Sequence, residues 1–176
     1  GTGITTGIKN TLIGSLAGDA LTDADYNTAV GYGALSTDTL GLRSTAVGYN
    51  TLSAQNFTSA TTSYNTAVGF GAGAAVTTGT HNTIIGGLSG DAITTGGSNA
   101  SVGKNSLTAN TTGSANAAFG ADALGSNTTA SNNTAVGTNS LNANTTGSEN
   151  VAVGRNALDA NTTAANNTAV GYAALG

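Results

Sequence analysis

The feature that most constrains this sequence is a phrase that recurs with a 17-residue period. A glycine that follows an apolar residue marks each copy. Of the nine intervals between these glycines, eight equal the period and one is lengthened by a four-residue insertion. The consensus N-T-A-V-G-x-N-A-L-x-A-N-T-T-G-S-x covers essentially all of residues 1–176, which are predicted to form a single repeat array. We call the marked residues the register glycines: Gly14, Gly31, Gly48, Gly69, Gly86, Gly103, Gly120, Gly137, Gly154 and Gly171.

The length and chemistry of the unit favour strands over helices. Helical repeats run about 33 to 47 residues, and the Gly, Asn and Thr of the consensus disfavour helix. Two short extended pieces, "TAV" and "AL", alternate with turns such as Gly48-Tyr49-Asn50, where Gly and Asn tolerate left-handed backbone. The sequence therefore predicts an all-β parallel β-solenoid, or β-roll, of ten 17-residue coils stacked about 4.8 Å apart, one coil carrying a four-residue insertion.

The residue before each register glycine is apolar in all ten copies. An apolar residue at a fixed place in every coil is expected to line the interior. The sequence thus predicts a structural core formed by Ile13, Val30, Val47, Val68, Ile85, Val102, Phe119, Val136, Val153 and Val170.

Two further columns indicate how successive coils are held together. Asn opens nine of the ten copies, with Ser44 as the exception, and stacked Asn side chains can hydrogen-bond from one coil to the next. The residue three places after each register glycine is always Ala, Ser or Thr, which indicates a close approach to another backbone.

A volume exchange links two other positions. Seven copies carry Leu four places after the register glycine, and the other three carry Gly there and an apolar residue three places later. Because interiors do not tolerate cavities, both positions are predicted to line one core. The three exchanged pairs are Gly18 with Leu21, Gly73 with Val76, and Gly90 with Ile93.

Composition excludes several classes of function. Only four residues are Lys or Arg and the net charge is −4, whereas nucleic-acid binding needs a basic stripe. No run of about 18 apolar residues predicts a membrane span. With no Cys and a single His, the chain offers no zinc set, no cofactor site and no grouped acid, base and nucleophile, so we expect a protein that is not an enzyme.

Three carboxylates in the first copy are a candidate calcium site. Asp19, Asp23 and Asp25 lie close in sequence, and calcium prefers such ligands. Their spacing matches neither an EF-hand loop nor the glycine-aspartate β-roll repeat. No metal site is predicted.

Aromatic and basic residues gather in the first half of the chain. One group follows the register glycines, a second precedes the opening Asn or Ser, and Phe57 lies in the insertion around residues 55–63. They can form a sugar- or receptor-binding face, since exposed aromatic side chains dominate interfaces. Alternatively, they stack on one another or pack between protomers. The candidate binding residues are Tyr26, Tyr32, Arg43, Tyr49, Phe57, Tyr64, Phe70 and His81.

The phrase "NTAVGYGAL" at residues 27–35 resembles the head repeats of trimeric autotransporter adhesins of the YadA-like type. It is also similar to 17-residue arrays in phage tail fibres and bacterial surface proteins. The resemblance implies a left-handed β-roll, three chains side by side, and a place outside the cell, on a cell or virion surface. The best-known head repeat of that family is shorter than the unit of this chain. The second turn of each unit, the A-N-T-T-G-S part of the consensus, is therefore expected to be longer here.

These observations predict a structural and adhesive module of an extracellular fibre, such as an adhesin head or a tail-fibre shaft. Its partners would be further copies of itself, as a homotrimer or an end-to-end polymer, and a host surface glycan or matrix protein. One alternative is a single-chain solenoid that stacks into a surface or matrix filament without a specific ligand. Another is an ice-binding solenoid, although adjacent threonines such as Thr111-Thr112 point in opposite directions where T-x-T is needed.

Overall fold

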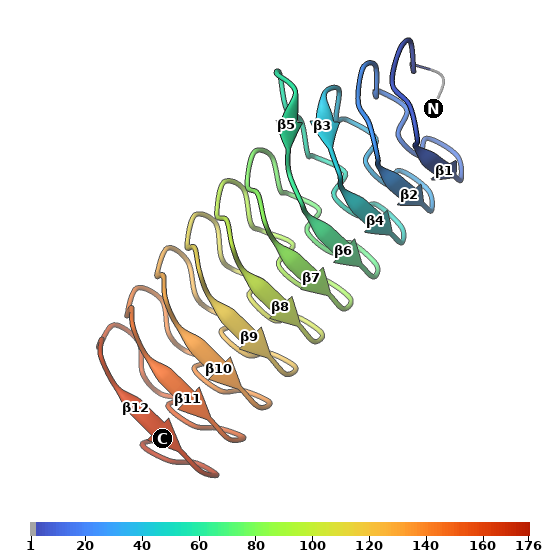
Figure 1. Cartoon of the computed structure of the whole chain (residues 1–176). Coiled ribbons are helices and arrows are strands. Elements are labelled where there is room, and N and C mark those ends of the chain that lie inside the picture. Colours follow the sequence, from blue (N-terminus) through green and yellow to red (C-terminus); the bar gives the residue numbers. More distant parts are fainter. Residues whose placement is uncertain (1–2) are drawn as a thin grey trace.

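A computed structural model describes residues 3–176, which form one row of stacked parallel coils without a helix (Figure 1). Ten short strands, one per coil, make a single parallel sheet along one side of the row. Their bounds are β1 Thr11–Ile13, β2 Thr28–Val30, β4 Thr45–Val47, β6 Thr66–Val68, β7 Thr83–Ile85, β8 Ala100–Val102, β9 Ala117–Phe119, β10 Thr134–Val136, β11 Val151–Val153 and β12 Thr168–Val170.

The predicted parallel β-solenoid is confirmed, with about nine turns instead of ten. Each strand pairs with the corresponding strand of the next repeat, as Thr134 of β10 does with Val151 of β11. Ten strands are joined by nine intervals, and β12 is the last strand of the row, paired only with β11. The insertion lengthens only the step from β4 to β6, and it is accommodated outside the main sheet, where β3 Gly41–Leu42 pairs with β5 Thr61–Thr62.

Successive register glycines touch one another across the coils. From Gly14 to Gly154 a Cβ on each would collide with backbone atoms of the next register glycine, and all ten have φ between 124° and 144°. A residue with a side chain would clash at this contact and would be strained at this φ. A register glycine is therefore required in every coil, for steric and for conformational reasons.

The predicted core column was wrong, because the residue before the register glycine faces outward. Its side chain is between 36% and 70% exposed in seven coils and partly exposed in the other three. Neighbouring residues of a strand point to opposite sides, and it is the middle residue that points in. The residues misassigned to the core are Ile13, Val30, Val47, Val68, Ile85, Val102, Phe119, Val136, Val153 and Val170.

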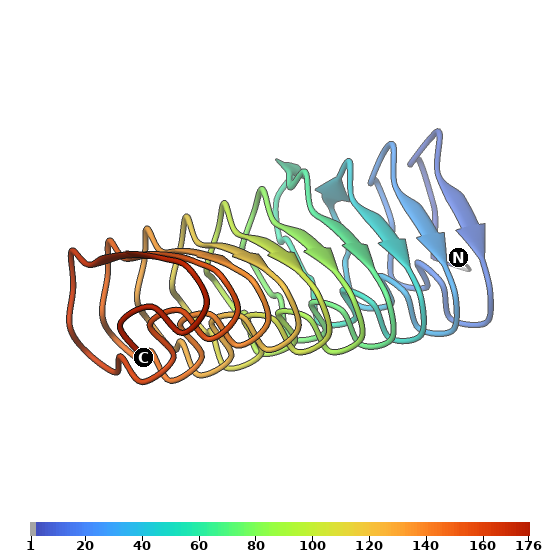
Figure 2. The ribbon, with the colours of Figure 1, turned by 90° about the horizontal axis from the view of Figure 1, so that it is seen from below.

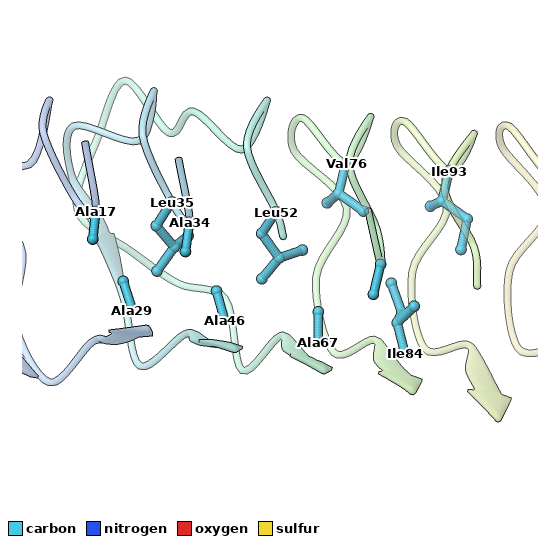
Figure 3. Close-up of a cluster of buried hydrophobic side chains, with 11 residues drawn as sticks. Ala17, Ala29, Ala34, Leu35, Ala46, Leu52, Ala67, Val76, Ile84 and Ile93 are labelled. Carbon is cyan, nitrogen blue, oxygen red and sulfur yellow. The ribbon is translucent and has the colours of Figure 1, made fainter. Parts of the chain in front are cut away.

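The true interior is lined by the middle residue of each strand and by the Leu column. Ala29, Ala46 and Ala67 are fully buried and point toward Leu35 and Leu52 (Figure 3). The middle residue is Ala in seven of the ten strands and lies opposite one larger residue, such as Leu35 or Leu52. The coil of β7 differs, because Ile84 and Ile93 are both fully buried there and Gly90 takes the place of the Leu.

The volume exchange predicted from the sequence is confirmed. Leu21, Val76 and Ile93 are fully buried in the coils that lack the Leu. A Cβ on Gly18 would lie 2.7 Å from Leu12 Cδ2 and 2.8 Å from Leu21 Cδ1, and a Cβ on Gly90 would lie 2.8 Å from Ile93 Cδ1. The inward-turned residue thus takes the space of the missing Leu.

The Leu column is buried at a conformational cost. Leu107 and Leu124 have φ of 50° and 52°, a left-handed conformation that costs an L-residue about 1–2 kcal/mol. Burying a Leu side chain contributes about 1.5–3 kcal/mol, and leaving its space empty adds a cavity penalty. Packing therefore outweighs backbone preference at this position.

Buried asparagines tie each coil to the next. Asn99 Oδ1 accepts the backbone N–H of Asn116 at 3.0 Å, and Asn99 Nδ2 donates to the carbonyl of Gly113 at 2.9 Å. The same pair of bonds recurs at Asn82 and Asn116. The predicted ladder exists, but it joins side-chain amides mainly to backbone. Each Asn thereby satisfies a buried N–H and a buried C=O.

Gln55 restores this ladder where Ser44 interrupts it. Gln55 Nε2 donates to Ser44 Oγ and to Asp38 Oδ2, both at 2.7 Å, and Gln55 Oε1 accepts from Asn65 Nδ2 at 2.8 Å. Asp38 also accepts the backbone N–H of Gly41 at 3.1 Å. The longer side chain of Gln55 reaches the place that Asn occupies elsewhere, so the insertion leaves no gap in the polar network.

The glycine contact predicts a sharp difference between two Gly→Ala substitutions. Gly103→Ala should lower the free energy of unfolding by about 2–4 kcal/mol, since the methyl group meets the Gly120 backbone at an unfavourable φ. Gly87→Ala should change it by less than about 0.5 kcal/mol, because a Cβ there meets nothing within 4 Å. Denaturant unfolding followed by circular dichroism measures both. Equal effects would contradict the requirement for glycine.

The volume exchange can be transplanted to a new coil. Leu107→Gly alone should cost about 3–5 kcal/mol through the cavity it leaves. Adding Asn110→Ile should recover at least half of that loss in the same unfolding assay. The Asn110 partners remain bonded without it, because Asn127 Nδ2 also donates to Ala130 and Gly113 O also accepts from Asn99. A double variant no more stable than Leu107→Gly would refute the exchange.

Candidate functional site

The outward side of the main sheet is a continuous uncharged surface. We call it the outer sheet face and define it as the first and third residue of each strand in the ten-stranded sheet. The first residues are Thr in seven strands and Ala or Val in the others, and the third residues are the exposed apolar column. The strands lie side by side along the whole row (Figure 2). This face thus presents Thr and Val in regular array, without a charge.

Two columns border this face at opposite ends of the strands. The leading rim is the residue before each opening Asn or Ser, and the trailing rim is the residue after each register glycine. The leading rim consists of Lys9, Tyr26, Arg43, Tyr64, His81, Ser98, Ala115, Asn132, Glu149 and Asn166. The trailing rim consists of Ser15, Tyr32, Tyr49, Phe70, Gly87, Lys104, Ala121, Thr138, Arg155 and Tyr172.

The trailing rim brings three of the candidate binding residues into one stack. The Tyr32 and Tyr49 rings are 5.5 Å apart between centroids and 12° from parallel, and Tyr49 and Phe70 are 5.1 Å apart and 7° from parallel. Stacking covers both faces of the Tyr49 ring. The edges of all three rings remain exposed to solvent.

The leading rim forms a second ladder that alternates rings with cations. The Arg43 guanidinium lies 5.1 Å from the Tyr26 ring centroid and 5.9 Å from that of Tyr64, and the rings of Tyr64 and His81 are 5.6 Å apart. Such contacts stabilise the cation by the electron-rich ring face. Four candidate residues from four successive coils are thus brought together.

Lys9 belongs to this ladder and was not identified from the sequence. Its Nζ donates to the Tyr26 hydroxyl at 3.0 Å and lies 4.7 Å from the ring centroid. The hydrogen bond to Tyr26 raises the pKa of Lys9 above its ordinary value, and the charge of Asp25 raises it further. The available signal was positional, since Lys9 precedes Tyr26 by one repeat.

The backbone of the leading rim is left-handed without glycine. Tyr26, Arg43 and His81 have φ of 62°, 61° and 61°, a region that bulky residues avoid. The backbone N–H of each donates to a carbonyl of the preceding coil, as Arg43 does to Asp25 at 3.1 Å. This repeated hydrogen bond offsets part of the conformational cost and fixes the direction of the rim side chains.

Phe57 does not belong to an exposed binding face. By sequence it was grouped with the surface aromatic residues, but it is only 5% exposed. Its backbone N–H donates to Asp38 Oδ1 at 3.1 Å, and its carbonyl accepts from Thr39 Oγ1 at 2.9 Å. The insertion folds its one aromatic ring inward, which gives the longer coil an apolar filling.

The acidic residues of the first coil are engaged in bonds between coils. Asp23 accepts from the Thr6 hydroxyl at 2.7 Å, and Asp25 accepts from the Ile8 N–H at 2.8 Å. Within residues 3–176, no group of three or more His, Cys, Asp or Glu could hold a metal ion. The same residues form no pocket, and none of them belongs to a helix able to cross a membrane.

The paired threonines of the second turn form hydrogen bonds between neighbouring coils of the solenoid. Thr94 Oγ1 donates to the carbonyl of Thr111 at 3.0 Å, and Thr111 and Thr128 donate to the next coil in the same way at 3.1 Å. The first hydroxyl of each such pair therefore ties neighbouring coils together.

No family model matches the chain, and comparison with curated proteins and with solved structures gives no match either. The function must therefore be inferred from the outer sheet face and its two rims.

Stacking on the trailing rim should contribute to stability. Tyr49→Ala removes two ring contacts and should lower the free energy of unfolding by about 1–3 kcal/mol. Thr138→Ala, in the same column but away from this stack, should change it by less than about 0.5 kcal/mol. Thermal unfolding and the near-ultraviolet circular dichroism of the tyrosines report on both. A Tyr49→Ala protein with unchanged melting would show that the stack is not stabilising.

Proposed function

We propose that this chain is a structural and adhesive module of an extracellular fibre, in which three left-handed β-rolls turn their outer sheet faces toward a common axis. One observation carries the proposal: a regular, uncharged face runs the length of the solenoid and carries a continuous column of exposed Val, Ile and Phe side chains beside its threonines. Seven of its ten third-position side chains are at least 36% exposed in the single chain. Contiguous apolar surface on that scale marks an interaction site.

Covering this face would bury apolar area that the narrow interior of the coil does not provide. The interior is filled largely by Ala at the strand centres, which provides little apolar area per coil. The Val, Ile and Phe side chains at the third position of each strand lie on the outside. Association through the outer sheet face would bury them and give each coil a second apolar layer. The number three follows from the resemblance to the adhesin head repeats.

Attachment to a surface is the second half of the proposal. The described residues offer no pocket, so recognition would use an extended surface repeated over several coils. A host glycan or a matrix protein fits a fibre of this kind, because many weak contacts at fixed spacing add up through multivalency. The module would stand outside the cell, on a cell or virion surface.

A charge on the outer sheet face tests the assembly. Light scattering of the wild type should give three times the chain mass of 16.8 kDa. Val136→Lys should shift the mass toward that of one chain, since burying three lysines near an axis is strongly unfavourable. Thr112→Lys, on the second turn away from this face, is the matched control and should leave the mass unchanged. A wild type with the mass of a single chain would contradict the proposal.

A further inference from the structure

We propose that the two rims form the seams between neighbouring chains, with the leading rim of one chain against the trailing rim of the next at the same coil. This inference rests on the proposed trimer and specifies its contacts. It assigns the aromatic and charged rim residues to binding a second copy of this chain. The candidate binding residues other than Phe57 thereby become interface residues.

Symmetry requires such a pairing if the outer faces meet around an axis. A ring of identical chains uses heterologous contacts, so one border of a chain meets the opposite border of its neighbour. Cyclic symmetry is a pure rotation, which keeps every residue at its own height along the axis. Each coil therefore meets the same coil of the next chain, and the rims must match coil by coil.

In one coil the two rims carry opposite charges. Glu149 and Arg155 flank the same strand, β11, and both side chains are exposed. Within one chain the extended strand β11 separates them by roughly 20 Å, too far for an ion pair. Between chains they would face each other directly. A shift of one coil in either direction would instead place Glu149 against Thr138 or Tyr172, without charge complementarity.

In some coils the rims also match in size or aromatic character. Three successive coils pair Tyr26 with Tyr32, Arg43 with Tyr49, and Tyr64 with Phe70. Another coil pairs Ala115 with Ala121. Large side chains thus face large ones in the three aromatic coils, and small side chains face small ones in this coil. No coil places two like charges together; the remaining pairs are Lys9 with Ser15, His81 with Gly87, Ser98 with Lys104, Asn132 with Thr138, and Asn166 with Tyr172.

Disulfide trapping tests the seam directly, because the chain has no cysteine of its own. The variant Ala115→Cys/Ala121→Cys should give covalent trimers on a non-reducing denaturing gel after mild oxidation. Ala115→Cys alone should give none, and neither should Ala115→Cys/Thr138→Cys, which is displaced by one coil. Trimers by light scattering without this cross-link would overturn the seam and leave the proposed fibre standing. A monomeric wild type would overturn both.

Charge reversal provides an independent test with a matched control. Glu149→Arg should weaken trimer association roughly tenfold by setting like charges together at three seams. Glu149→Arg/Arg155→Glu should restore association to near the wild-type level. Glu149→Arg/Lys104→Glu has the same net charge but places the new carboxylate three coils away, and it should not restore association. Sedimentation equilibrium measures all four proteins, and equal recovery in both double variants would contradict the proposed register.

Discussion

The contact between successive register glycines is the constraint on which the rest of this structure depends. It brings each coil so close to the next that no side chain fits between them, and it does so at a φ that glycine alone adopts without strain. Because this contact recurs at the end of every strand, it fixes the parallel register of the sheet. Asparagines join the same coils at the start of nine strands, and Ser44 with Gln55 takes their place before β4, so each strand is held at both ends.

This fixed register decides which side chains face inward. With the glycine held at the coil contact, the residue before it must point out and the strand-centre residue must point in. The interior that results is thin, filled by Ala on one side and by a left-handed Leu on the other. The most apolar column of the repeat is consequently left on the surface, together with threonine and without any charge. An ordinary soluble chain would reverse this distribution, and the reversal is the basis for proposing that partner chains cover the face.

The repeat made the fold predictable, whereas the inward and outward faces required the structure. Periodicity alone led to the parallel solenoid, the Asn ladder and the exchange of Leu for Leu21, Val76 or Ile93. The prediction of the core column was wrong because it assigned the more apolar residue, Val, to the interior and the less apolar Ala to the surface. Hydropathy gives no information on how narrow the interior of the coil is. The prediction that Phe57 is exposed was wrong for a related reason. Phe57 lies in the insertion, and no equivalent residue in another repeat indicates which way its side chain points. The sequence showed the rim residues as columns of the repeat. It did not show the cation–π contacts of Arg43, because these depend on a left-handed backbone, which bulky residues seldom adopt.

The most direct test of this arrangement, with Ala inside and the larger apolar residues outside, is the reactivity of cysteines introduced singly at two adjacent positions of strand β9. Single variants Ala118→Cys and Phe119→Cys would be labelled with a maleimide, both in the native protein and in a Val136→Lys background, which is expected to dissociate the proposed trimer. Cysteine at 118 should stay unreactive in both states, because Ala118 is fully buried within the coil. Cysteine at 119 should react rapidly in dissociated chains and slowly in the native protein. Rapid labelling of position 119 in both states would show that no partner covers the outer sheet face.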